Sequence, residues 1–289
     1  RSGDYYFLPT TTSSLLKISL ADGQIVSRTA TRAPLGNLIC YKNEVVTHSA
    51  GSVEAYYQTS ALRSRVAARL EQNADDSWAL ARQGELLLHD GKSEEALRVL
   101  RRAHELDPND DAVRSLLVST FLAAIKLDFA AHRELSEQVQ PLIDLPSQLA
   151  EFWRLTAEGY HASGELSRAV DAYLALADLG SKSSNGQEMS EPLLIEQDST
   201  WSVRSDRWIQ ARLAELFESD DEAVRNKLAS YITQRAASSE DRSLAELQHD
   251  LDHFGFHDAC APLRLVFADR LIEAKRFVEA EMLLAPLRD

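Results

Sequence analysis

The chain has 289 residues, of which 44% are hydrophobic and 26% are charged, as in an ordinary globular protein. Its formal net charge of −14 argues against a general nucleic-acid binder, because phosphate contacts need clustered Lys and Arg. The charge balance is +1 over residues 1–60 and −15 over residues 61–289, so two segments of different character join near residue 60.

The first segment, residues 1–58, reads as short antiparallel strands rich in aromatic and branched residues. Asp22-Gly23 is a strong hairpin signal between two of these strands. We expect strands at 5–8, 15–20, 24–27, 37–41, 45–49 and 52–56. So few strands bury little apolar surface and leave exposed sheet edges. Since the chain also begins at Arg1 without a Met, we expect a fragment of a larger protein, with more of this β-domain upstream.

From Ser60 onward the apolar spacing changes from a period of two to a period near 3.6, which predicts helices. We expect them at about 60–72, 77–89, 93–106, 110–126, 129–143, 147–163, 165–179, 200–218, 220–236, 239–253, 258–274 and 276–287. Residues 181–199 predict a loop, because 181–186 is a cluster of Ser, Asn and Gly. The apolar stub Leu193-Leu194-Ile195 follows that cluster. Loops of this length are often functional or disordered.

Residues 77–110 carry the pattern of a helix pair that repeats with a period of about 34 residues. Asp90-Gly91 predicts the turn between the two helices, and Gly84 holds the position at which this repeat pattern brings the helices too close for a side chain. Counting Ser77 as position 1, the pattern is filled by Gly84 (8), Leu87 (11), Ala96 (20), Leu100 (24), Ala103 (27) and Pro108 (32). This segment resembles a tetratricopeptide repeat (TPR), whose helix pairs stack into an α-α superhelix, or solenoid.

Three further segments resemble the same repeat. Residues 150–179 match through Trp153, Ala157, Tyr160, Gly164, Ala169 and Tyr173, and residues 261–287 match through Ala268, Leu271, Ala280 and Leu284. Residues 111–145 form a degenerate unit in which Leu117 and Phe121 fit. The resemblance covers about two-thirds of the chain. It implies a mainly α fold, with TPR-like repeats at 59–180, the loop at 181–199 and further TPR-like helical hairpins at 200–289.

The run from Leu16 to Ser27 resembles the strand–turn–strand repeat of a quinoprotein (PQQ)-like β-propeller. Ser27 stands where that family usually has a Trp that docks one blade on the next. The resemblance implies that residues 1–58 close an incomplete propeller on which the helices pack. No cofactor-binding residue carries over, so we predict no cofactor. Propellers of this type are commonly exported, which favours the bacterial periplasm or cell envelope over the cytoplasm.

The TPR resemblance also implies a concave groove lined by the first helix of each pair. The residues at its groove positions include Trp78, Glu85, Leu88, His89, Ser119, Leu122, Arg154, Glu158 and His161. This groove is apolar in its middle, with Arg154 and carboxylates at the rim. A helix or extended peptide with apolar anchors and basic flanks would suit it.

Three functions remain open at this stage. The first is a non-catalytic scaffold that binds a peptide or docks neighbouring domains. The second is a quinoprotein-like oxidoreductase whose active site lies in sequence upstream. The third is a purely structural support, in which the same side chains cover the next repeat or pack on the propeller.

Motifs for catalysis are not found, since the sequence has no P-loop, no G-x-S-x-G and no C-x-x-C. Cys40 and Cys260 suggest no disulfide framework, and no apolar stretch reaches the roughly 18–20 residues of a membrane span. His249 and His253 have the i, i+4 spacing of two metal ligands. We instead expect exposed imidazoles opposite the buried stripe of their helix, and Trp201 and Trp208 in the core. The sequence therefore predicts no catalytic residue and no metal.

Overall fold

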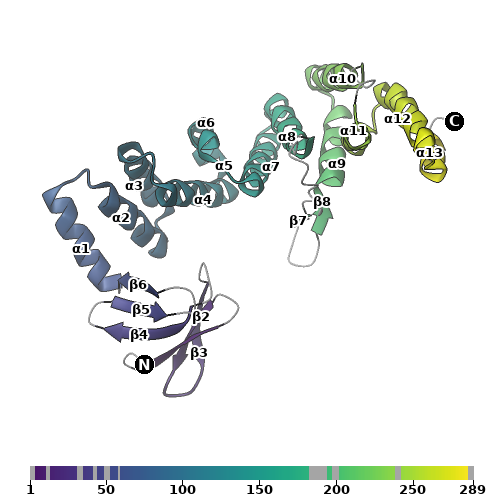
Figure 1. The fold of residues 1–289 in the computed structure, drawn as a ribbon. Helices are drawn as coiled ribbons and strands as arrows, with labels where there is room; N and C mark the ends of the chain where they lie inside the picture. The colour runs from purple at the N-terminus through teal and green to yellow at the C-terminus, as the bar shows by residue number, and fades with distance from the viewer. Residues whose placement is uncertain are drawn as a thin grey trace. The chain divides into compact units, whose positions relative to one another are not determined.

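The computed structural model shows a mainly helical protein with small antiparallel sheets at its N-terminal end (Figure 1). It describes residues 4–10, 14–30, 35–41, 44–48, 53–57, 59–181, 194–196, 202–237 and 242–285. The chain forms two compact units, Arg1–Leu117 and Val118–Asp289, which are described separately below. The division falls inside helix α4 (Asp111–Leu127). The domain boundaries expected from the sequence stay predictions.

The six strands expected in the first unit are all present. They are β1 (Tyr5–Pro9), β2 (Ser14–Ser19), β3 (Ile25–Ala30), β4 (Asn37–Tyr41), β5 (Glu44–His48) and β6 (Val53–Tyr57). They pair in chain order as two antiparallel three-stranded sheets, and the described strands form no closed barrel. Gly23, at a φ of 72°, donates its N–H to the Ser19 carbonyl at 3.0 Å, which confirms the hairpin turn.

The helices of the first unit are α1 (Thr59–Gln72), α2 (Ser77–His89), α3 (Ser93–Leu106) and the start of α4. The second unit holds the rest of α4 and the short helices α5 (Phe129–His132) and α6 (Ser136–Val139). It continues through α7 (Pro146–Ala162), α8 (Leu166–Ser181), α9 (Ser205–Phe217), α10 (Glu222–Ala237), α11 (Leu244–Phe254), α12 (Ala261–Glu273) and α13 (Phe277–Leu284). Most expected helices are therefore confirmed within a few residues.

Three of the expected helices differ from the structure. The helix expected over 239–253 begins at Leu244, because Ser243 caps its first turn. The segment expected as one helix over 129–143 is broken into α5, α6 and 3₁₀ turns, the last of which contains Pro141, a residue without an N–H to donate. The helix expected from residue 200 begins at Ser205, because β8 (Ser202–Arg204) pairs with β7 (Leu194–Glu196). Trp201 and most of the expected loop lie outside the described residues.

The helix pairs α2–α3, α7–α8 and α12–α13 share one turn geometry. Each turn has a residue with positive φ: Gly91 at 75°, Gly164 at 74° and Lys275 at 60°. The N–H of the next residue bonds back to the carbonyl five residues earlier: Lys92 to Leu87 (2.9 Å), Glu165 to Tyr160 (2.9 Å) and Arg276 to Leu271 (2.8 Å). This closure satisfies carbonyls at the end of the first helix. The three segments aligned by sequence therefore have the same local structure.

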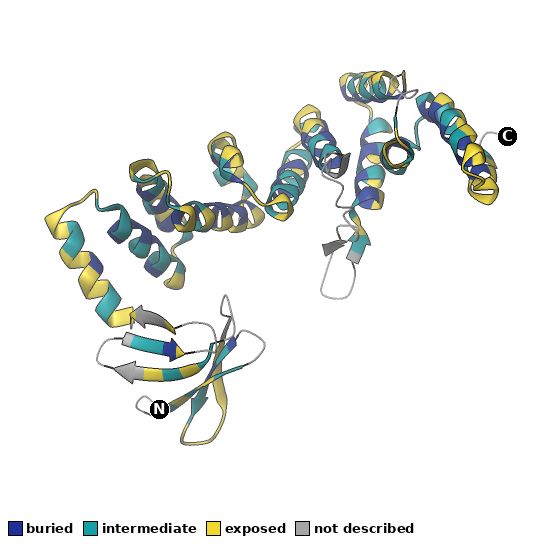
Figure 2. Cartoon of the chain, viewed as in Figure 1, coloured by how far each residue is buried: buried dark blue, intermediate teal, exposed yellow. Residues whose placement is uncertain are grey.

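Small residues set the contact within each of these pairs. A Cβ added to Gly84 would lie 2.6 Å from side-chain atoms of Leu100, so the close approach expected at Gly84 is confirmed. In the second helices, the equivalent residues Ala96, Ala169 and Ala280 are almost completely buried. Figure 2 shows buried residues on the sides that face within the pairs, and mostly exposed residues on α13.

The core of the second unit is assembled from helices that are distant in sequence. It includes Tyr173 of α8, Trp208 and Leu213 of α9, Leu228 of α10 and Leu247 of α11. The Tyr173 and Trp208 rings lie 5.6 Å apart, which confirms Trp208 as a core residue. Asp221 caps α10 by accepting the N–H groups of Ala223 and Val224 at 3.0 and 3.1 Å.

Candidate functional site

Trp78, the first of the predicted groove residues, is held between arginines of α1. The guanidinium carbons of Arg65 and Arg69 lie 5.3 and 4.9 Å from the Trp78 ring centroid. Arg65 also stacks on Tyr57 of β6 at 4.9 Å, and Arg69 donates to Asp76 at 2.6 Å. This Trp is therefore part of the joint that connects α1 with β6 and α2.

The other groove candidates of α2 are partly exposed. Glu85 forms an ion pair with Arg82 at 2.5 Å, and its side chain is 34% exposed. Leu88 is half-buried, and His89 is exposed with its Nδ1 3.4 Å from Asp90. These side chains remain accessible to a partner.

The groove candidates of the second unit differ in exposure. Ser119 is exposed, whereas Leu122 is only 4% exposed and faces the interior. Arg154 and Glu158 form an i, i+4 ion pair at 2.8 Å, with side chains 20% and 40% exposed. His161 is half-buried, with its ring centroid 6.4 Å from that of Tyr173. Whether the candidates of the two units line one groove stays a prediction.

His249 and His253 are not exposed, contrary to the sequence-based expectation. His253 is 5% exposed and His249 is half-buried, and their ring centroids lie 4.3 Å apart. Burial lowers the pKa of His249 to about 4 and also lowers the pKa of His253. The expectation failed because neighbouring helices cover more of α11 than the face that carries its leucines. Among the described residues, no group of three or more His, Cys, Asp or Glu could hold a metal ion.

A buried ion cluster lies next to these histidines. Asp250, 1% exposed, accepts from Arg235 Nε at 2.6 Å and also pairs with Arg242. Arg235 reaches Asp178 of α8 at 2.5 Å, and the Tyr231 hydroxyl donates to the same carboxylate at 3.1 Å. The cluster connects α8, α10 and α11. It was not foreseen, because its members are spread over distant parts of the sequence and match no motif.

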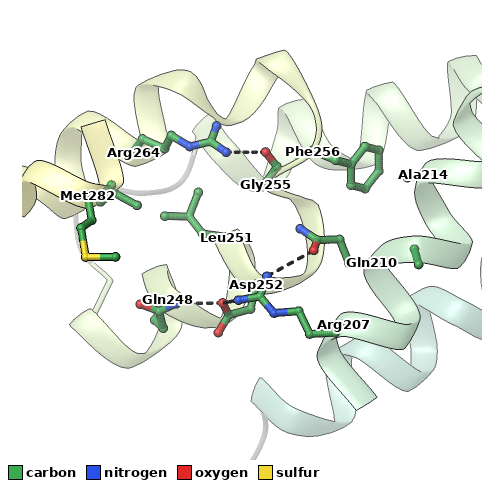
Figure 3. A pocket seen from close by; sticks show the side chains of 12 residues that line it. Arg207, Gln210, Ala214, Gln248, Leu251, Asp252, Gly255, Phe256, Arg264 and Met282 are labelled. Atoms are coloured by element: carbon green, nitrogen blue, oxygen red, sulfur yellow. Dashed lines mark hydrogen bonds and ion pairs between the residues drawn. The ribbon is translucent and has the colours of Figure 1, made fainter. Parts of the chain in front are cut away.

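A surface hollow of about 510 Å³ lies where α9 and α11 meet α12 and α13 (Figure 3). Leu251, Phe256 and Leu283 contribute apolar side chains to its lining. Arg207 and Arg264 contribute guanidiniums. The hollow therefore combines an apolar lining with positive charge, in a chain whose net charge is −14.

The charged groups of the hollow are unequally exposed. The Arg207 side chain is 55% exposed, with its nearest acceptors at 3.3 Å (Gln210), 3.5 Å (Asp252) and 4.0 Å (Asp206). The Asp252 side chain is 16% exposed and accepts from Gln248 at 2.9 Å. The accessible charge on this side of the hollow is therefore mainly that of the guanidinium.

Arg264 is fixed at the C-terminal end of α11. It donates to the Gly255 carbonyl at 2.5 Å, an arrangement favoured by the negative end of the helix dipole. A Cβ on Gly255 would lie 2.5 Å from the Leu251 carbonyl oxygen and 3.3 Å from the Arg264 guanidinium. The missing side chain therefore leaves room for the guanidinium.

The α13 side of the hollow is apolar and open. Met282 lines the hollow and is 72% exposed, and Val278, one turn earlier, is 71% exposed. Residues at this spacing share a helix face. This surface could have been found from the sequence. At the positions of Val278 and Met282, the equivalent helix α8 has the polar residues Ser167 and Asp171, so the apolar residues of α13 are unusual there.

Comparison of the chain with protein-family models and with curated proteins gives no match. Within the part of the chain that the structure describes, no helix combines the length and apolar character needed to cross a membrane.

Proposed function

We propose that this chain is a non-catalytic protein-interaction scaffold, a helical repeat array similar to TPR solenoids that binds a peptide segment or docks a neighbouring domain. The observation that carries the proposal is the recurrence of one helix pair, with the same positive-φ turn and the same small buried residue, at α2–α3, α7–α8 and α12–α13. A single pair of this kind cannot bury its apolar face alone, so neighbouring pairs stack.

The proposed groove takes a partner with apolar anchors and basic flanks. Glu85 and Glu158, at equivalent places on α2 and α7, keep 34% and 40% of their side chains exposed. Each is paired with an Arg of its own helix, and such partly exposed pairs are worth on the order of 1 kcal/mol. Basic side chains of a partner can therefore exchange with these arginines at little cost.

Site-specific photo-crosslinking of the full chain tests this function. A benzoylphenylalanine replaces Glu85 or Glu158 in the predicted groove. In the matched controls it replaces Arg98 of α3 or Arg168 of α8, which are exposed on the second helices of the same pairs. We expect both groove positions to crosslink one partner polypeptide in cells of the source organism, and the control positions to crosslink it far less.

Equal crosslinking at all four positions, or none at Glu85 and Glu158, would contradict a binding groove on the first helices. The array would then be better described as an internal structural support.

A further inference from the structure

We propose that the hollow between α9, α11, α12 and α13 is a second binding site, and that it takes a short acidic peptide segment in which carboxylates flank large apolar side chains. None of its lining residues belongs to the predicted groove. The ligand expected in the hollow is acidic, whereas the ligand expected in the groove has basic flanks.

The size and lining of the hollow fit side chains of a peptide. Its volume of about 510 Å³ lies within the roughly 300–1,000 Å³ of known ligand pockets. Leu251, Phe256 and Leu283 offer an apolar lining for a Leu, Met or Phe side chain. Such pockets typically combine an apolar lining with a few polar groups that fix orientation.

Charge complementarity points to a carboxylate as the polar group of the ligand. Arg207 makes only long contacts, at 3.3 Å or more, although charge-assisted N–H···O bonds are normally about 2.7–2.9 Å. Its planar guanidinium can form two parallel bonds with one carboxylate. Asp252, the acidic residue in the lining, is largely covered and offers little to a basic ligand.

Arg264 supplies a second positive charge on another side of the hollow, with Leu251 between the two arginines in the view of Figure 3. Because Arg264 is fixed against Gly255, it is already ordered before a ligand binds. This preorganisation reduces the entropy cost of binding. Two guanidiniums on either side of an apolar lining match acidic residues on either side of an apolar anchor.

The exposed strip of Val278 and Met282 extends the apolar lining along α13. Apolar patches bordered by polar groups commonly mark interaction sites. Methionine is unbranched and flexible, so it adapts to differently shaped side chains and is frequent at surfaces that bind several peptides. We therefore expect the site to recognise a pattern of acidic and apolar residues rather than one sequence.

Selection from a displayed library of random peptides on the full chain identifies the chemistry without a known partner. We expect one class of enriched peptides to combine Asp or Glu with Leu, Phe or Met, and this class is used to test the hollow. Arg207→Gln and Met282→Asp should each weaken binding of an enriched, labelled peptide by roughly tenfold or more, since each removes a principal contact. Arg212→Gln on α9 and Leu265→Asp on α12 are controls, exposed but outside the lining, and should bind within about twofold of wild type.

Failure to enrich any acidic peptide, or binding of the enriched acidic peptides by Arg207→Gln and Met282→Asp as tight as by wild type, would each overturn the acidic-peptide site. Basic peptides whose binding these two substitutions leave unchanged would be assigned to the predicted groove instead. Self-association of the chain that Met282→Asp abolishes would assign the face to a second copy instead. Crosslinking at Glu85 and Glu158 does not involve this hollow, so the failure of one proposal leaves the other standing.

Discussion

At the scale of single residues, the three matched turns allow the cost of a side chain at positive φ to be measured within one protein. Gly91 and Gly164 adopt this conformation without a Cβ, whereas Lys275 adopts it with one. We expect Lys275→Gly to raise the free energy of unfolding by about 0.5–1 kcal/mol and Gly91→Ala to lower it by about 1 kcal/mol. Urea denaturation followed by circular dichroism measures both. A loss of stability in Lys275→Gly would show that its turn is not strained.

Gly84 tests the contact between α2 and α3. A methyl group at this position meets Leu100, so Gly84→Ala should destabilise the first unit by about 1–3 kcal/mol through overpacking. Gln83→Ala, on the half-buried neighbour, should change stability by less than about 0.5 kcal/mol and controls for the general effect of substitution in α2. Equal stability of the Gly84 variant and wild type would mean that Leu100 can move aside freely.

The sequence was informative wherever a residue's role depends on near neighbours. Gly84 was placed correctly because it holds the position of the repeat pattern at which the two helices of a pair come close. His253 was misplaced because its burial depends on helices that come from distant parts of the chain. The hollow around Arg207 was also not foreseen, since its lining comes from four helices.

At the scale of elements, the burial of α11 makes stability depend on pH. His249 faces His253, Asp250 and Arg235 and is held neutral, so its folded pKa of about 4 lies below the ordinary 6.5. The unfolded chain therefore binds more protons between these values. The free energy of unfolding is therefore highest above pH 6.5. It falls by about 2–3 kcal/mol as the pH drops towards 4.

Urea midpoints at pH 7 and pH 4.5 measure this dependence. His249→Leu should reduce the difference between the two midpoints, because the group that gains a proton on unfolding is removed. His89→Leu changes an exposed imidazole and should leave the difference as in wild type. An unchanged pH difference in His249→Leu would assign the effect to other groups.

The ion cluster around Asp250 should contribute strongly to the packing of α8, α10 and α11. Asp250→Asn removes the carboxylate that Arg235 and Arg242 share and leaves Arg235 with Asp178 as its remaining acidic partner. Breaking this largely buried cluster should cost about 3 kcal/mol. Glu279→Gln removes an exposed partner of Arg276 and should leave the urea midpoint unchanged. A small effect of Asp250→Asn would mean that water or a rearranged side chain replaces the carboxylate.

Short irregular elements were the hardest part of the fold to predict. The strands β7 and β8 are three residues each, too short for a period of two to be visible in the sequence. The helix expected over 129–143 breaks after His132, and Pro141 lies in its last 3₁₀ turn. At the start of this segment, Phe129 packs on Gly159 of α7. That contact between distant residues cannot be read from local spacing. The Ser243–Glu246 capping box, by contrast, is a readable signal for the start of α11 that was overlooked.

At the scale of the whole molecule, the division into two compact units predicts separate responses to mutation. Asp250→Asn should speed amide hydrogen exchange in α8, α10 and α11 and leave the protection of α2 and α3 unchanged, because those helices belong to the first unit. Gly84→Ala should have the reverse effect. Mass spectrometry of exchanged peptides measures both, and parallel loss of protection throughout the chain would show that the units unfold as one.

The same ion cluster has a consequence for synthesis on the ribosome. Asp178 is translated 57 residues before Arg235, and Asp250 follows 15 residues after Arg235. Helix α8 therefore emerges with a carboxylate whose partner does not yet exist, and its apolar face lacks the helices that later cover it. The apolar face of α8 therefore lacks this cover until α11 has left the exit tunnel. The second unit thus reaches its packed state only after α11 has been translated, later than the first unit.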